Sequence, residues 1–179
     1  MMNRVKKMVL IMLSAILFAS IPLALAFRTN PPASEAGQYL PESGYRKVAA
    51  DYRKISVKYA TIKQNNAEIR AMKVAMKVRI KEIEARIIQL KQQNGKGLTA
   101  GDVAEMKTVT VNVEKAKSVL QASSGHLNRK VSQLKEVKKS GDSAGILRSL
   151  EEIISIQNSR INTLKEINKN LDDMKKTLG

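Results

Sequence analysis

The chain has 179 residues, with no Cys, no Trp, one His and few aromatic side chains, and its formal charge is +16. The absence of Cys excludes disulfides, thiolate catalysis and Cys-type zinc sites. The scarcity of aromatic bulk argues against a compact α/β or all-β core. The large positive charge favours anionic partners such as acidic polymers, lipid headgroups or nucleic acid, and a basic surface that only confers solubility is an equal alternative.

Residues 1–26 have the pattern of a secretory signal peptide. A basic start precedes an uncharged apolar stretch, and Ala24-Leu25-Ala26 is a small-x-small cleavage pattern, which places the cut after Ala26. The alternative is an uncleaved anchor formed by residues 8–27, about 20 residues and just long enough to span a bilayer. Both interpretations put the rest of the chain outside the cytoplasm, secreted or associated with the cell envelope.

Residues 27–41 contain three prolines and no helical periodicity, which predicts a flexible leader. A long helix is expected over residues 42–94, because two columns of residues, each spaced by seven, alternate at intervals of three and four. Asn66 and Lys73 are polar members of this seam, and we expect them to set the register of a coiled coil rather than to bind a ligand. The first column is Tyr45, Tyr52, Tyr59, Asn66, Lys73, Ile80 and Ile87; the second is Val48, Ile55, Ile62, Ile69, Met76, Ile83 and Leu90.

A second helix is predicted over residues 99–139, with Thr99 as its N-cap and Asp102 three residues later. Its seam begins at Met106 and ends at Val137. Gly125 is the softest point, because glycine costs ~1 kcal/mol relative to alanine within a helix, and a break there would give four helices. A third helix is predicted over residues 143–178, with a seam from Ile146 to Leu178.

The fold class expected for residues 42–179 is therefore all-α, an antiparallel three-helix coiled-coil bundle with an extended first helix. Short turns make neighbouring helices antiparallel. The second and third helices are shorter than the first, so we expect about residues 42–54 to project past them. Tyr45, Val48 and Tyr52 on that end are a candidate contact for a second copy, a partner helix or a membrane surface; fraying of this end, or cover by the leader, is an equal alternative.

The first helix is also the most basic segment, with 13 Lys and Arg against five Asp and Glu. Its densest basic run is the candidate anion-binding stripe, although a solvated helix face is the more frequent meaning of such a run. The members of the stripe are Arg70, Lys73, Lys77, Arg79 and Lys81.

The sequence offers no catalytic constellation. His126 lies next to a seam position with no second base for a triad, and the glycines at 95, 97 and 101 lack the spacing of a phosphate-binding loop. Glu82 and Arg86 have the spacing of a surface ion pair. We therefore expect no enzyme, no cofactor and no metal site.

Three hypotheses remain for the function. The first is an exported, non-enzymatic coiled-coil protein that binds an anionic polymer or a partner protein through its basic first helix. The second is an extracytoplasmic chaperone-like protein that binds clients: the plan of a small, basic, exported helical protein is similar to that of periplasmic holdases of the Skp type, although no motif of that family is matched and its β-rich trimerisation body has no counterpart. The third, a nucleic-acid binder, ranks last because export and the few aromatic side chains argue against it.

Overall fold

The computed structural model describes residues 42–92 and 99–179, with only the helical backbone of 42–49 and 91. These residues form three helices, α2 (Glu42–Gln92), α3 (Ala100–Ser140) and α4 (Ser143–Thr177), and the described part of the chain contains no strand. The expected all-α bundle is confirmed at this level. The predicted signal peptide and leader lie outside the described residues, as does the end of the first predicted helix after Gln92.

Local sequence explains where the second and third helices begin and end. Thr99 accepts a hydrogen bond from the Asp102 amide, and the Asp102 side chain accepts one from the Thr99 amide, which together make a capping box. Gly141 ends α3 in the left-handed conformation with φ of 70°, which glycine adopts without steric cost. Asp142 then caps α4. Helix α3 is continuous through Gly125, so the structure shows no break there.

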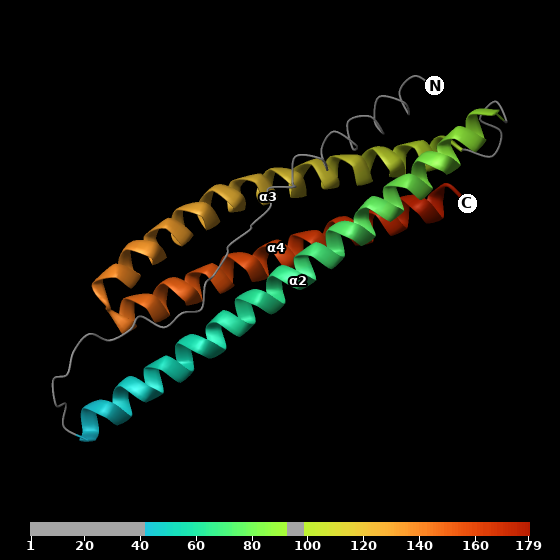
Figure 1. The fold of residues 1–179 in the computed structure, drawn as a ribbon. Coiled ribbons are helices and arrows are strands. Elements are labelled where there is room, and N and C mark those ends of the chain that lie inside the picture. Colours follow the sequence, from blue (N-terminus) through green and yellow to red (C-terminus); the bar gives the residue numbers. More distant parts are fainter. Residues whose placement is uncertain (1–41, 93–98) are drawn as a thin grey trace.

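Helix α4 lies between the other two helices (Figure 1) and packs along both of them. It runs parallel to α2, because cross-helix pairs keep a sequence offset of 93 from Asn65–Asn158 to Arg79–Asp172 and Lys175–Glu82. It runs antiparallel to α3, where Arg160 meets Leu120. The tight turn at Gly141 places α3 and α4 side by side.

The apolar seams of the three helices form two buried clusters. The cluster near the α3–α4 turn contains Ile62, Leu134 and Leu150, and the cluster towards the chain end contains Met76, Val113 and Leu164. All three helices contribute to each cluster. The alternation of threes and fours that predicted the seams therefore also identifies the core.

A polar layer separates the two clusters at the level where each helix replaces an apolar seam residue by a polar one. The amide of Asn65 donates to Asn158 at 2.9 Å, and that of Gln157 donates to Asn66 at 2.9 Å. Gln157 is fully buried. These hydrogen bonds form only where the polar residues of the helices lie at the same level. The polar layer consists of Asn65, Asn66, Ser123, Ser124, Gln157, Asn158 and Arg160.

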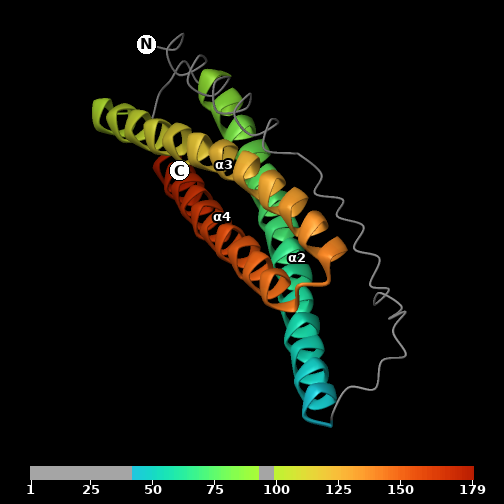
Figure 2. The ribbon, with the colours of Figure 1, turned by 90° about the vertical axis from the view of Figure 1, so that its left-hand side faces the viewer.

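The N-terminal end of α2 projects beyond the α3–α4 turn (Figure 2). Among the residues whose side chains are described, the first hydrogen bond between α2 and α4 runs from the Ser143 hydroxyl to the Asp51 carboxylate, at 3.0 Å. Residues 42–50 precede it and extend for about 13 Å at the usual helical rise. The projecting end is therefore shorter than the expected residues 42–54.

Candidate polyanion-binding surface

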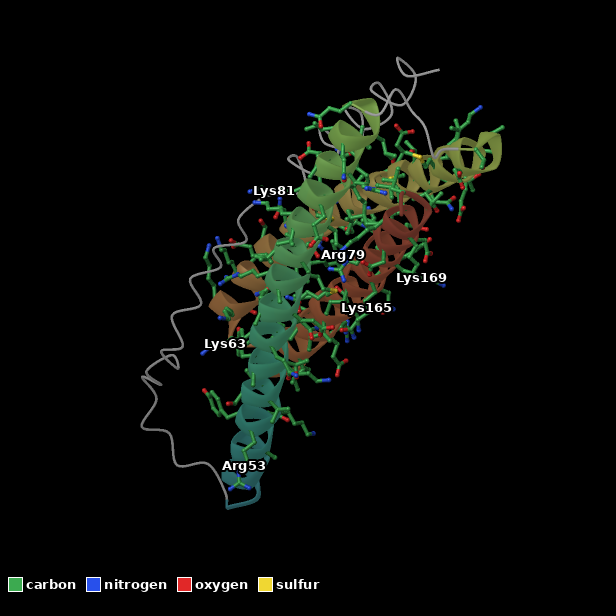
Figure 3. All side chains as sticks on the ribbon, turned by 90° about the vertical axis from the view of Figure 1, so that its right-hand side faces the viewer. Arg53, Lys63, Arg79, Lys81, Lys165 and Lys169 are labelled. Atoms are coloured by element: carbon green, nitrogen blue, oxygen red, sulfur yellow. The ribbon has the colours of Figure 1, made fainter. Side chains whose placement is uncertain are left out.

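The five cations of the predicted stripe do not share one face of α2. Arg70, Lys77 and Lys81 are exposed, whereas Lys73 and Arg79 are partly covered. Figure 3 shows Lys63 and Lys81 on one side of α2 and Arg79 directed towards α4. The helical period separates these directions, because each residue turns by about 100° relative to the one before it.

Arg79 is held at the α2–α4 interface. Its Nε donates to the Asp172 carboxylate at 2.6 Å, and the two side chains are 29% and 44% exposed. This hydrogen bond is the main cause that lowers the pKa of Asp172 and raises that of Arg79. Arg79 therefore acts in helix pairing, and an added anion would compete with Asp172 for it.

Lys73 faces the interior beside the polar layer. Burial lowers its pKa, and the positive charges of Arg160 and Lys77 lower it further. Arg160 is itself buried, which lowers its pKa, and its Nη1 donates to neutral acceptors, the Ser123 and Ser124 hydroxyls at 2.8 and 2.6 Å and the Leu120 carbonyl at 3.0 Å. The positive charges of Lys73 and Arg160 thus lie near each other beside the polar layer, which sequence spacing could not reveal because the two residues lie on different helices.

The exposed cations of α2 form a line along one side of the helix. Lys63, Arg70 and Lys77 are spaced by seven residues, and Lys81 follows Lys77 by one turn. The line is about 27 Å long at the helical rise of 1.5 Å per residue. None of these four cations forms a salt bridge with any residue in the described part of the chain. We call Lys63, Arg70, Lys77 and Lys81 the basic line.

Two acids of α2 near the basic line are engaged elsewhere, whereas Glu84, seven residues after Lys77, lies just beyond its end and forms no salt bridge among the described residues. Glu68 pairs with Lys165 at 3.1 Å, and Glu82 pairs with Lys175 at 2.9 Å, both across to α4. Glu82 therefore pairs with Lys175 rather than with Arg86 as expected; Arg86 donates instead to the Leu178 carbonyl at 2.8 Å. Lys63 was not in the predicted stripe, although it has the same heptad position as Arg70 and Lys77.

Two of the three candidate partner-contact residues, Tyr45 and Val48, have side chains outside the described part of the structure. Tyr52 is 45% exposed. Asp51, its neighbour, already contacts α4 through Ser143. Tyr52 therefore lies where the projecting end meets the bundle, and its exposed ring is accessible to a partner.

Within the described residues, no group of three His, Asp or Glu side chains could hold a metal ion. His126 is exposed on α3. No helix among the described segments is long and apolar enough to cross a membrane.

Comparisons of this chain with protein-family models, with curated proteins and with solved structures find no match.

Proposed function

We propose that this chain is an exported, non-enzymatic helical protein of the cell envelope or extracellular space that binds an anionic polymer through the basic line of α2. The observation that carries the proposal is the row of four exposed cations, Lys63, Arg70, Lys77 and Lys81, without acidic partners among the described residues. An exposed ammonium or guanidinium in such a row can exchange its counterions for the charges of a polymer. The rigid helix fixes the spacing between these charges.

The geometry favours an extended polymer over a small anion. The cations lie along about 27 Å of helix rather than around one point, and no acid interrupts the line. Each contact made at an exposed site is weak, so affinity must come from several contacts at once. A polymer with regularly repeated negative charges satisfies this condition.

Export is the second part of the proposal and rests on the sequence of residues 1–26. A basic start, an uncharged apolar stretch and the Ala24-Leu25-Ala26 pattern support cleavage after Ala26. If the chain is cut there, the exported protein begins at Phe27 and its intact mass falls accordingly. An exported protein that keeps residues 1–26 would instead support an anchor formed by residues 8–27.

We also propose that α2 and α4 pair as in a coiled coil. Three α2 residues at spacings that are multiples of seven, Lys58, Asn65 and Arg79, each contact α4 with a polar or charged partner. Polar pairs beside an apolar seam set alignment in coiled coils. This pairing keeps α2 straight enough for its basic line to present a regular row of charges.

The test is binding of polyphosphate as a function of salt concentration. The variant Lys63→Gln/Arg70→Gln/Lys77→Gln/Lys81→Gln removes the basic line, and Lys107→Gln/Lys115→Gln/Arg129→Gln/Lys135→Gln removes the same charge from exposed positions on α3. If the basic line binds the polymer, the first variant reduces the slope of log K against log salt by roughly three. The α3 variant then changes the slope much less.

Two results would overturn the proposal. Equal losses in the two variants would show that binding depends on total charge and has no preferred surface. Unchanged binding by the basic-line variant at physiological salt would show that these four cations do not contact the polymer. Helicity measured by circular dichroism shows whether both variants are folded, which is expected because all eight side chains lie on the surface or its margin.

A further inference from the structure

The face of α2 that points away from the bundle carries a second apolar seam. Its positions again alternate at intervals of three and four, and every one of them is exposed. Val57, Val74 and Ile88 are 64%, 62% and 55% exposed, unusually high fractions for such side chains in regular spacing. We call this face the outer seam; it consists of Val57, Ala60, Gln64, Ala67, Ala71, Val74, Val78, Lys81, Ala85 and Ile88.

The outer seam lies opposite the buried column of α2. Ile62, Ile69 and Met76 point into the bundle, and the helical period places the outer seam about half a turn away from them. No residue in the described part of the chain covers it. A helix with one apolar face needs only one packing partner, so a second apolar face indicates a second partner.

The side chains of the outer seam are suited to another helix. In the central stretch from Ala60 to Ala85, six of the eight seam positions are Ala or Val, which lets the backbones of two helices approach closely. Helices with a sustained seam of threes and fours associate through side chains inserted between those of the facing helix. The seam extends over about 47 Å from Val57 to Ile88.

We propose that the occupant of the outer seam is the same helix of a second copy of this chain, parallel and in register. This contact is additional to polymer binding, and the charges that flank the outer seam identify its occupant. One flank of the outer seam carries three bases followed by one acid, Lys63, Arg70, Lys77 and Glu84, and the other carries the acids Glu68 and Glu82. A complementary helix must therefore place acids against the first flank and bases against the second.

A parallel, in-register copy meets this requirement. In that arrangement, a flanking residue meets the residue five positions later on the other chain. Lys63 then faces Glu68 of the second copy, and Lys77 faces Glu82 of the second copy, and symmetry repeats both pairs. An antiparallel copy brings each flank against itself, so that Arg70 meets Lys77 where Lys63 meets Glu84, and the repulsion of the first pair offsets the attraction of the second. The flanking charges therefore select orientation and register together.

Three features of α2 limit the strength of this association. Gln64 and Lys81 interrupt the outer seam, as polar residues do where they fix register at a cost in stability. The helix is also positively charged overall, so two copies repel each other at low salt. Glu68 and Glu82, which already hold Lys165 and Lys175, would each be shared between two cations. We therefore expect a reversible dimer that becomes stronger as added salt screens the repulsion.

The orientation is tested by cysteine cross-linking of the full chain, which has no cysteine of its own. Ala60→Cys and Ala85→Cys lie near opposite ends of the outer seam, and Ala122→Cys is the matched control on the exposed surface of α3. In a parallel, in-register dimer, each of the first two variants forms a disulfide with itself, and the control does not. Cross-linking only between Ala60→Cys and Ala85→Cys in a mixture would show an antiparallel dimer and overturn the proposal.

The charge pairs are tested by reversal, with sedimentation equilibrium as the measurement. Lys63→Glu/Lys77→Glu and Glu68→Lys/Glu82→Lys each replace four attractive pairs by repulsive ones, which we expect to weaken self-association by roughly 100-fold. An equimolar mixture of the two variants restores attraction and should form mixed dimers. If neither variant weakens association, or the mixture fails to recover it, the assignment of the charge pairs is wrong.

The apolar contact is tested by Val74→Gln/Val78→Gln, compared with Val111→Gln/Val119→Gln at exposed positions on α3. Only the α2 variant should dissociate the dimer, and helicity should be retained in both. A monomeric mass for the unmodified chain would overturn this inference without affecting polymer binding. Conversely, a dimer that ignores polyphosphate would overturn the proposed function and leave the dimer in place.

Discussion

The polar layer predicts that one substitution in the core will raise stability. Gln157 is completely buried, and its Oε1 has no hydrogen-bond partner among the described residues. Its Nε2 donates to Asn66 at 2.9 Å and to the Ile62 carbonyl at 3.3 Å. Replacement by leucine, which has a similar volume, removes the unpaired carbonyl and extends the apolar seam.

The magnitude follows from the opposing contributions. Removing a buried polar group without a partner gains about 1–3 kcal/mol. The two lost hydrogen bonds cost about 0.5–1.5 kcal/mol each, and the long contact to Ile62 belongs at the lower end. Asn66 is only partly buried, so water can satisfy its released oxygen. Because a leucine side chain adds apolar burial of about 1 kcal/mol or more, we expect Gln157→Leu to raise the free energy of unfolding by about 1–2 kcal/mol.

The measurement is urea unfolding of the full chain followed by circular dichroism. Leu164→Ala, at a fully buried position in the apolar cluster towards the chain end, is the reference for core disruption and should cost about 2–5 kcal/mol. If Gln157→Leu instead lowered the free energy of unfolding by about 1 kcal/mol or more, the size of one hydrogen bond, Gln157 would be a net stabilising member of the polar layer. The reasoning from its unpaired carbonyl would then be refuted.

The remaining predictions concern two glycines and one ion pair. Gly125→Ala should stabilise α3 by about 0.5–1 kcal/mol, because a Cβ there meets no atom within 4 Å and the helix is continuous. Gly145→Ala should destabilise the chain in the same unfolding assay, because its Cβ would lie 2.8 Å from Val137 Cγ1 and closer still to the Asp142 carboxylate. The hydrogen bond from Arg79 holds the pKa of Asp172 below its ordinary value, so the pair stabilises the fold above the unfolded pKa of about 3.9 and loses this contribution as pH falls through the folded pKa. After solvent screening, the contribution of this pair to stability is at most about 1 kcal/mol. Arg79→Gln should raise the Asp172 pKa measured by NMR. An unchanged pKa would show that the pair is absent in solution.

The seams could be predicted from sequence because burial follows helical period closely. In α3, the β-prone run from Thr108 to Val111 is helical, since its seam member Val109 is buried and the Thr110 hydroxyl bonds back to the Met106 carbonyl at 2.8 Å. Tertiary burial thus overrides local propensity there. The N-cap at Thr99 could likewise be predicted from the sequence, because the capping box depends on two residues only three positions apart.

The relative alignment of the helices could not be predicted in this way. A slip of seven residues preserves every seam, so periodicity alone does not select the offset of 93 that joins Asn65 to Asn158. The burial of Arg160 depends on hydroxyls from another helix, Ser123 and Ser124, and was not foreseen. For the same reason, Arg79 was predicted to belong to the exposed stripe. Its carboxylate partner, Asp172, lies 93 residues away in the sequence.

The two proposed contacts of α2 constrain each other. Lys63 and Lys77 belong both to the basic line and to the flank that would meet Glu68 and Glu82 of a second copy. Dimerisation leaves the net positive charge of each copy unchanged, because the two copies only share their carboxylates. The dimer therefore carries twice the charge of the monomer. Two repelling copies are held together more easily when a polymer contacts both, and binding that favours the dimer must by linkage be strengthened by dimerisation. Polyphosphate should therefore increase the dimer fraction at low salt, and it should lose this effect in the Val74→Gln/Val78→Gln variant while still binding to the monomer.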